Sequence, residues 1–130
     1  MTGIRKEEIV EDKKELLCRI AGLLFQKGLV SGKDGNISIK TGEDEMLITP
    51  SGICKGFLTP DMIIRQRFDG TIIEGSLKST REAGMHSRLY ELRPDIGCCR
   101  TYPSGGRHGL RRMRTEVSGK LAAGGPRSNR

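Results

Sequence analysis

The chain has 130 residues, of which 35% are hydrophobic and 30% are charged, and its formal net charge is +7. This length is enough for one domain, and the composition is that of a globular protein rather than a fibrous or unfolded one. No apolar run approaches the roughly 20 residues that cross a bilayer, and no signal peptide is apparent. The four cysteines follow neither zinc-site nor secreted-disulfide spacing. We therefore expect a cytoplasmic protein that makes no contact with membranes.

The positive charge is concentrated near the end of the chain. Residues 97–130 contain one acidic residue, Glu116, and eight basic ones: Arg100, Arg107, Arg111, Arg112, Arg114, Lys120, Arg127 and Arg130. Residues 1–96 therefore carry no net charge. A nucleic-acid-binding surface is normally built into the fold, whereas this excess begins abruptly at one point. We do not expect nucleic acid as a partner.

The first predicted element is an amphipathic helix over residues 6–27. Its apolar residues recur at spacings of three and four, and Gly28 is placed to end it. The predicted buried face consists of Ile9, Leu16, Ile20, Leu23 and Leu24.

Strand patterns follow this helix. Residues 36–40 alternate polar and apolar side chains, as a half-buried strand does, and residues 46–49 form the returning strand. Asp69-Gly70 separates the apolar runs 63–68 and 71–74, and this dipeptide is a strong hairpin signal.

A second helix is predicted from Ser79 to about Leu92. Met85, Leu89 and Leu92 would share one side of it, and the following Arg93-Pro94 would stop it. Residues 95–97 resemble the entrance to a further strand. Beyond Cys99 we predict neither helix nor strand.

Two glycine turns interrupt the first part of the chain, at residues 32–38 and 50–53. Glycine lets backbone N–H groups approach a ligand, and successive N–H groups at a turn can hold an anion. Gly35-Asn36 and Ser51-Gly52 could therefore form a phosphate cradle in two pieces. Ordinary turns use the same residue types, so the residues alone leave both interpretations open.

Glu82 is the sharpest candidate for chemistry. A carboxylate in the first turn of a helix can act as a general base or a metal ligand. However, Ser79-x-x-Glu82 also fits a capping box, worth about 1 kcal/mol, and from the residues alone we favour the cap. His86 shares the helix face of Glu82, but two ligands do not make a zinc site. We expect His86 to pack or to make a surface hydrogen bond.

Four segments in unbroken order resemble the class II aldolase/adducin family, over about residues 8–98. They are Gly32-x-x-Gly35-Asn36-Ile37-Ser38, Leu47-Ile48-Thr49-Pro50-Ser51-Gly52-Ile53, Leu77-Lys78-Ser79-Thr80-Arg81-Glu82-x-x-Met85-His86 and Tyr90-x-x-Arg93-Pro94-Asp95-Ile96-Gly97. The family includes L-fuculose-phosphate aldolase and L-ribulose-phosphate 4-epimerase. The resemblance implies an α/β fold with three α/β/α layers around a mainly antiparallel sheet, and a homotetramer, which we doubt for this chain.

The resemblance also implies roles for individual residues. Glu82 would exchange a proton with an ene-diolate intermediate, while a zinc ion polarises the substrate oxygens. The substrate would be a small phosphorylated sugar. Its phosphate would be held by Gly35, Asn36, Ser51, Gly52, Thr80 and Arg81. Arg81 departs from the serine of the fuculose-phosphate aldolase pattern, although arginine can bind phosphate through two hydrogen bonds.

The zinc ligands implied by the resemblance are missing. The family has His-x-His on the strand after the Arg-Pro-Asp segment, where this chain has Arg100-Thr101-Tyr102. Arginine stays protonated and cannot ligate, and the region of a third, later histidine is absent. Glu82 is the only surviving metal candidate. We therefore expect no zinc, and an inactive, truncated relative of the zinc-dependent aldehyde-lyases.

A shifted reading frame would explain the missing histidines. Synonymous codons for residues 100–111, read one base later, can encode Val-His-Thr-His-Pro-Ala-Ala-Asp-Met-Ala-Phe. We therefore expect two parts, an aldolase-like portion over 1–98 and a disordered, out-of-frame basic tail over 99–130. The alternatives are a non-catalytic adducin-like binding or assembly protein, or the epimerase or dehydratase branch of the family.

Overall fold

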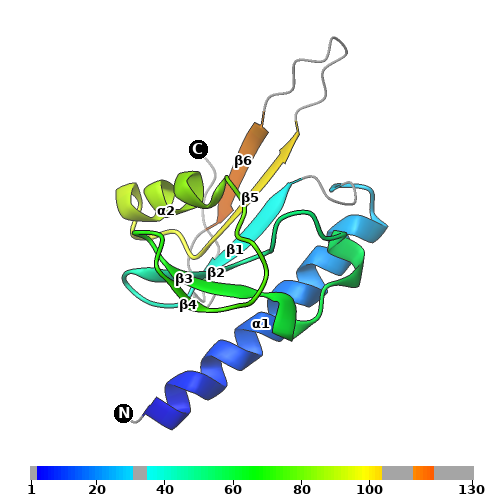
Figure 1. Ribbon diagram of the computed structural model, residues 1–130. Coiled ribbons are helices and arrows are strands. Elements are labelled where there is room, and N and C mark those ends of the chain that lie inside the picture. Colours follow the sequence, from blue (N-terminus) through cyan, green and yellow to red (C-terminus); the bar gives the residue numbers. More distant parts are fainter. Residues whose placement is uncertain (1–2, 31–34, 104–112, 119–130) are drawn as a thin grey trace.

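The computed structural model describes residues 3–30, 35–103 and 113–118. In these ranges six strands form one sheet in the order β4-β3-β2-β1-β5-β6, and every neighbouring pair is antiparallel. The helices α1 (Gly3–Gln26) and α2 (Ala83–Leu92) lie on opposite faces of this sheet (Figure 1). The expected three-layer α/β/α fold with an antiparallel centre is confirmed. Within the same ranges, no helix has the length and apolar character of a membrane span.

Helix α1 packs on the sheet through a stripe that overlaps only in part with the one that periodicity selected, since Leu16 and Leu24 do pack against the core. Its buried apolar residues are Val10, Leu17 and Ala21, whereas Ile9 and Leu23 are 45% and 50% exposed. Neighbouring positions differ by about 100° around a helix, so a choice displaced by one residue selects another face. The core beneath α1 is completed by Ile37, Ile39, Leu47 and Ile63.

Both predicted strand pairs are confirmed. Strands β1 (Asn36–Lys40) and β2 (Glu45–Ile48) pair with Ser38 opposite Ile48. Strands β3 (Ile64–Arg67) and β4 (Ile72–Glu74) flank the Asp69-Gly70 turn, where Gly70 has a φ of 100°. That left-handed conformation favours glycine. Two short 3₁₀ helices, Lys55–Phe57 and Pro60–Met62, lie between the two pairs.

Helix α2 also turns an unexpected face toward the sheet. Of the predicted residues, Leu89 packs against the core, whereas Met85 and Leu92 are exposed. The fully buried positions are Ala83, His86, Ser87 and Tyr90. The Tyr90 ring stacks on Phe68 with centroids 5.6 Å apart. The second core is completed by Met46, Ile48, Ile64, Ile96 and Cys99. An apolar pattern could not find this face because half of it is polar.

The prediction of no strand beyond Cys99 is wrong. Strand β5 (Cys98–Pro103) pairs with β1, and β6 (Met113–Ser118) pairs with β5. Without β5, one edge of β1 would leave its backbone N–H and C=O groups unpaired. Strand formation depends strongly on such partners, which a local pattern does not contain. The rest of the predicted tail, residues 104–112 and 119–130, lies outside the described residues.

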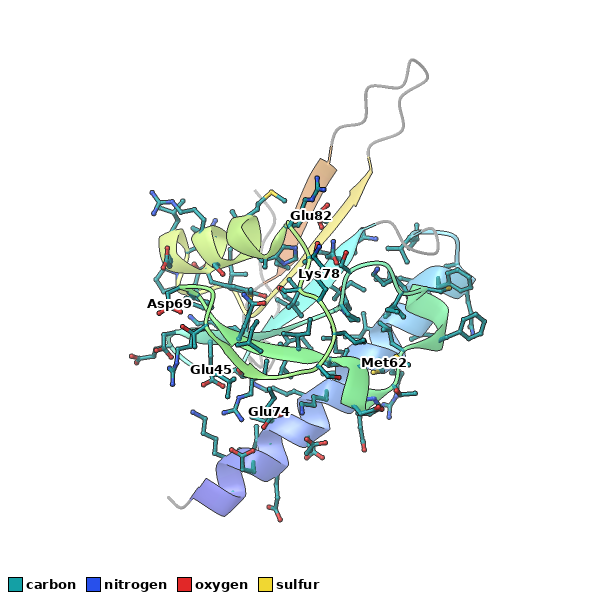
Figure 2. All side chains as sticks on the ribbon, viewed as in Figure 1. Glu45, Met62, Asp69, Glu74, Lys78 and Glu82 are labelled. Atoms are coloured by element: carbon teal, nitrogen blue, oxygen red, sulfur yellow. The ribbon has the colours of Figure 1, made fainter. Side chains whose placement is uncertain are left out.

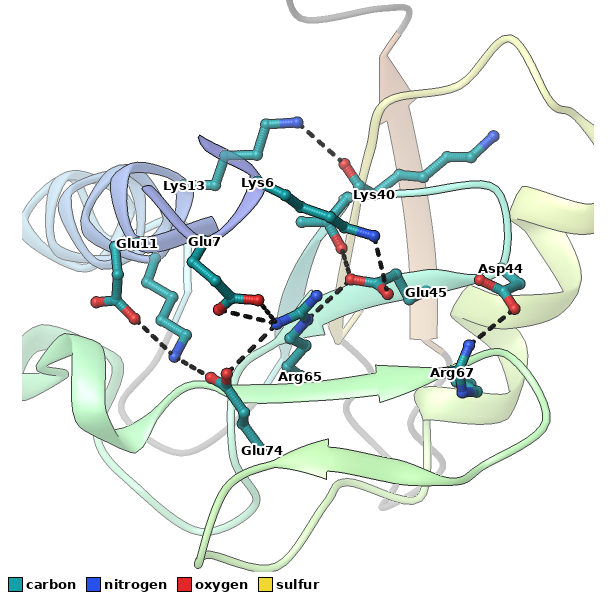
Figure 3. Close-up of polar contacts among 12 residues, drawn as sticks. Lys6, Glu7, Glu11, Lys13, Lys40, Asp44, Glu45, Arg65, Arg67 and Glu74 are labelled. Atoms are coloured by element: carbon teal, nitrogen blue, oxygen red, sulfur yellow. Dashed lines mark hydrogen bonds and ion pairs between the residues drawn. The ribbon is translucent and has the colours of Figure 1, made fainter. Parts of the chain in front are cut away.

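A partly buried ionic cluster joins α1 to the sheet (Figure 3). Arg65 on β3 donates from Nε to Glu45 Oε2 at 2.8 Å, and its Nη1 lies 3.3 Å from carboxylate oxygens of Glu7 and of Glu74. Lys14 on α1 also bonds to Glu74, at 2.5 Å. Charges removed from water are tolerated only when they are paired in this way. The cluster therefore fixes the position of α1 over strands β2, β3 and β4.

Candidate functional site

Three segments that are distant in sequence meet at one end of the sheet. They are the start of β1 at Gly35-Asn36, the turn after β2 at Ser51-Gly52, and the segment before α2. The backbone N–H of Ser51 donates to the carbonyl of Lys78 at 3.0 Å. The side chain of Asn36 donates from Nδ2 to Glu82 Oε1 at 2.8 Å. Figure 2 shows Lys78 and Glu82 on this segment, beside the ends of the strands.

Glycine has a conformational role in both predicted cradle turns. Gly35 and Gly52 have φ values of 84° and 76°, a region that other residues adopt at a cost. A Cβ atom at Gly52 would meet no atom within 4 Å, so the backbone conformation, not lack of space, calls for glycine there. Residues 31–34 of the first turn lie outside the described residues.

Asn36 connects the strands to the carboxylate. Its side chain is buried, its Oδ1 accepts a hydrogen bond from Thr49 Oγ1 at 3.1 Å, and its Nδ2 donates to Glu82. An amide nitrogen carries two N–H donors. One of these two donors holds Glu82.

The capping-box interpretation of Glu82 is wrong. The Ser79 hydroxyl donates instead to Gln66 Oε1 at 2.6 Å, and the Glu82 side chain makes no capping bond. Glu82 Oε1 accepts from Asn36 and from Thr101 Oγ1, the latter at 2.5 Å. The carboxylate is thus drawn away from the helix start toward β1 and β5. Its residue is half-buried, so a solvent-borne ligand can reach it.

A buried polar chain continues behind Glu82. Thr101 Oγ1 lies 3.4 Å from His86 Nε2, His86 Nδ1 lies 2.7 Å from Ser38 Oγ, and Ser38 Oγ lies 2.7 Å from the Tyr90 hydroxyl. Burial lowers the pKa of His86 to about 4, although the charge of Glu82 acts in the opposite direction. Burial likewise raises the pKa of Tyr90. Both side chains are therefore neutral near pH 7. Of the two roles expected for His86, packing is the correct one, because the side chain is fully buried.

Sequence reasoning missed three members of this chain: Ser38, Tyr90 and Thr101. A signal was present for two of them. Asn36 and Ser38 are two residues apart, so they share one face of β1, and His86 and Tyr90 are four apart on one face of α2. Polar residues at these spacings indicate that a polar face of β1 and a polar face of α2 pack against each other.

Two exposed cations flank the site. Lys78 and Arg81 lie on the segment before α2, and neither side chain forms an ion pair with a described residue. Thr80, between them, is half-buried, and its Oγ1 accepts from the backbone N–H of Glu82 at 3.2 Å. A loop with two exposed cations beside the glycine turns is suited to an anionic ligand.

The side chains around Glu82 are not of the kinds that bind zinc. Strand β5 places Thr101 against the carboxylate, while Arg100, which we had aligned with a ligand, alternates to the other face. Zinc takes cysteine, histidine and carboxylate ligands, and here hydroxyls, an amide and an already bonded imidazole surround Glu82. No group of three such ligands exists among the described residues.

Comparison with known proteins gives a consistent result. The family model described as class II aldolase and adducin N-terminal domain matches residues 15–100. L-fuculose phosphate aldolase of Methanocaldococcus jannaschii is 39% identical over 85 residues, which are 65% of this chain and 45% of that protein. The 3-oxo-tetronate 4-phosphate decarboxylase of Escherichia coli K12 is 32% identical over 87 residues, 67% of this chain and 41% of that protein.

Solved structures are also similar to this chain. The crystal structure of YgbL from Escherichia coli has a TM-score of 0.69 and 28% identity, covering 78% of this chain and 52% of that one. The chain spans less than half the length of the curated relatives it matches. Members with other reactions, including a methylthioribulose-1-phosphate dehydratase, are also similar to it.

Proposed function

We propose that this chain, which belongs to the class II aldolase and adducin N-terminal domain family, binds a phosphorylated sugar where its three site segments meet. The observation that carries the proposal is the pair of bonds Ser51–Lys78 and Asn36–Glu82, which hold the segments together. The phosphate would lie between the glycine turns and Arg81. The relatives' names, which specify phosphorylated substrates, support the same ligand class.

Glu82 would be the acid/base of this site. Its Oε1 is held by two donors, and among the described residues its Oε2 has no hydrogen-bond partner. A fixed carboxylate with one open oxygen can take a proton from a carbon next to a carbonyl, or return it. Aldol cleavage, decarboxylation and dehydration of sugar phosphates all share this proton transfer, so the site by itself favours none of them.

We also propose that the chain as translated holds no zinc and performs no aldol cleavage. The support is the identity of residue 101, where a threonine hydroxyl, not an imidazole, contacts Glu82. In the shifted reading frame the Val-His-Thr-His run places its first histidine at position 101. That placement supports a frameshift, and sequencing the gene around codons 97–100 tests it. An intact frame that cannot spell His-x-His would refute it.

Binding is tested by calorimetric titration of the full chain with L-fuculose 1-phosphate, with L-fuculose as the unphosphorylated control. We expect binding of the phosphorylated sugar only. Arg81→Ala should weaken it about tenfold, the scale of one charge-assisted hydrogen bond. Arg88→Ala is the matched control, because Arg88 is exposed on α2 and its ion pair with Glu91 is 3.9 Å long. Equal affinity for both sugars, or equal loss in both variants, would contradict the proposal.

Zinc is tested separately. After dialysis against zinc and removal of the excess, we expect metal analysis to find far less than one zinc per chain. We also expect no release of an aldehyde from L-fuculose 1-phosphate. Zinc-dependent cleavage by the purified chain would overturn this second proposal and leave the first one standing.

A further inference from the structure

The buried polar chain behind Glu82 has four members without access to solvent. Ser38, His86 and Thr101 are 0% exposed and Tyr90 is 1% exposed. With no water to exchange partners, each hydrogen must go to one of the neighbouring atoms. The direction of every bond in the chain can therefore be worked out from one end.

Glu82 defines that end. An ionised carboxylate only accepts, so Thr101 donates its single hydroxyl hydrogen to Glu82 Oε1, 2.5 Å away. Toward His86, Thr101 can then only accept. The hydrogen in the 3.4 Å contact must accordingly belong to His86 Nε2.

The remaining bonds follow from the neutral imidazole. With Nε2 protonated, Nδ1 is an acceptor, so Ser38 donates to it across 2.7 Å. The hydrogen of Ser38 is then used, and the Tyr90 hydroxyl must donate to Ser38 Oγ. Every donor in the chain finds one acceptor, and the reversed direction would require Glu82 to donate.

We infer that His86 is a positioning residue: its Nε2–H directs the hydroxyl of Thr101 toward Glu82. Thr101 has a competing acceptor, the carbonyl oxygen of Asn36 at 3.5 Å. A hydrogen bond donated to the hydroxyl oxygen polarises the O–H bond of Thr101, which favours the charged acceptor Glu82 over this alternative. The claim that His86 helps to position an acid/base rests on the function proposed for Glu82. The bond directions do not depend on that function.

The bond directions are tested by NMR of the full chain with ¹⁵N-labelled histidine near pH 7. We expect the imidazole of His86 to give the signals of the neutral Nε2–H tautomer. His108, the other histidine of the chain, is told apart by His108→Gln. A neutral Nδ1–H tautomer, or a doubly protonated ring, would overturn the inference, and this measurement requires no change at the site.

The positioning role is tested by the ¹³C signal of the Glu82 carboxylate. His86→Leu should shift this signal, and His86→Gln should restore it, because glutamine can donate to Thr101 and accept from Ser38. Thr101→Val should also shift this signal. Because His86 acts through Thr101, the double variant with His86→Leu should show the same shift as Thr101→Val alone. A shift in both His86 variants, or additive shifts in the double variant, would contradict the role. Failure of sugar binding with these signals intact would refute only the proposed function.

Discussion

Arg65 should be among the residues on which folding depends most, although it lies outside the candidate site. Only 7% of its side chain is exposed, and that of Glu45, its closest partner, is 4% exposed. Arg65→Met keeps the unbranched apolar stem of the side chain and removes the charged guanidinium. The carboxylate of Glu45 then remains buried without its main cation.

The expected cost follows from what Glu45 retains. Removing one partner of a buried ion pair costs about 3–5 kcal/mol. Thr41 Oγ1 still donates to Glu45 at 3.0 Å, and Lys6 lies 3.7 Å from it. We therefore expect the lower end, about 3 kcal/mol, which is a large part of the roughly 5–15 kcal/mol by which domains are stable.

The assay is urea unfolding followed by far-UV circular dichroism. Arg67→Met is the matched control, because Arg67 and Asp44 form a pair whose side chains are 45% and 66% exposed. Exposed pairs contribute no more than about 1 kcal/mol. Glu45→Leu combined with Arg65→Met should recover much of the loss. Equal effects of Arg65→Met and Arg67→Met would refute the reasoning that burial makes the first pair important.

The same pair predicts how stability depends on pH. Burial acts to raise the pKa of Glu45, but hydrogen bonds from Arg65 and Thr41 outweigh it and leave the pKa below 4.5. Because the folded pKa is the lower one, this contribution is complete above the unfolded pKa and is lost as the pH falls through the folded pKa. Unfolding free energies measured across this acid range should fall more steeply for the native sequence than for Arg65→Met. Parallel curves would exclude Glu45 as the source.

Three further predictions concern packing and burial. Gly56→Ala should lower the free energy of unfolding by about 1–3 kcal/mol, because its Cβ would lie 2.5 Å from the ring of Phe25. Gly22→Ala should instead raise it by about 0.5–1 kcal/mol, because its Cβ would meet no atom within 4 Å and alanine favours the helix. Urea unfolding measures both changes. Ser87→Ala should stabilise the fold by about 1 kcal/mol, since the buried Ser87 hydroxyl has no hydrogen-bond partner among the described residues, and a loss of stability would show a missed partner. Burial raises the pKa of Cys99 to about 12, so mass spectrometry should find Cys99 unmodified by iodoacetamide at about pH 8 until urea unfolds the chain.

Local sequence determined the secondary-structure elements that depend on interactions between residues close in the chain. The Asp69-Gly70 turn fixes the β3–β4 hairpin, because the positive φ of Gly70 bends the chain back on itself. Periodicity predicted that both helices exist, but it found only part of each buried face: Leu16, Leu24 and Leu89 do pack against the cores, whereas the fully buried positions are others. The order of the motifs predicted the family, which comparison with known proteins confirmed. Each of these inferences needs only residues that are close in the chain, or their order.

Tertiary structure alone decided which atoms meet at the candidate site. Glu82 could cap its own helix or turn toward β1, and the amide of Asn36, 46 residues earlier, draws it to the strand. Strand β5 forms because β1 offers it an unpaired edge, and the register places Thr101 opposite Asn36. Such contacts depend on backbone pairing between distant segments, which no local spacing records. The composition of residues 97–130 predicted only a charged tail, whereas pairing with β1 makes Cys98–Pro103 a strand.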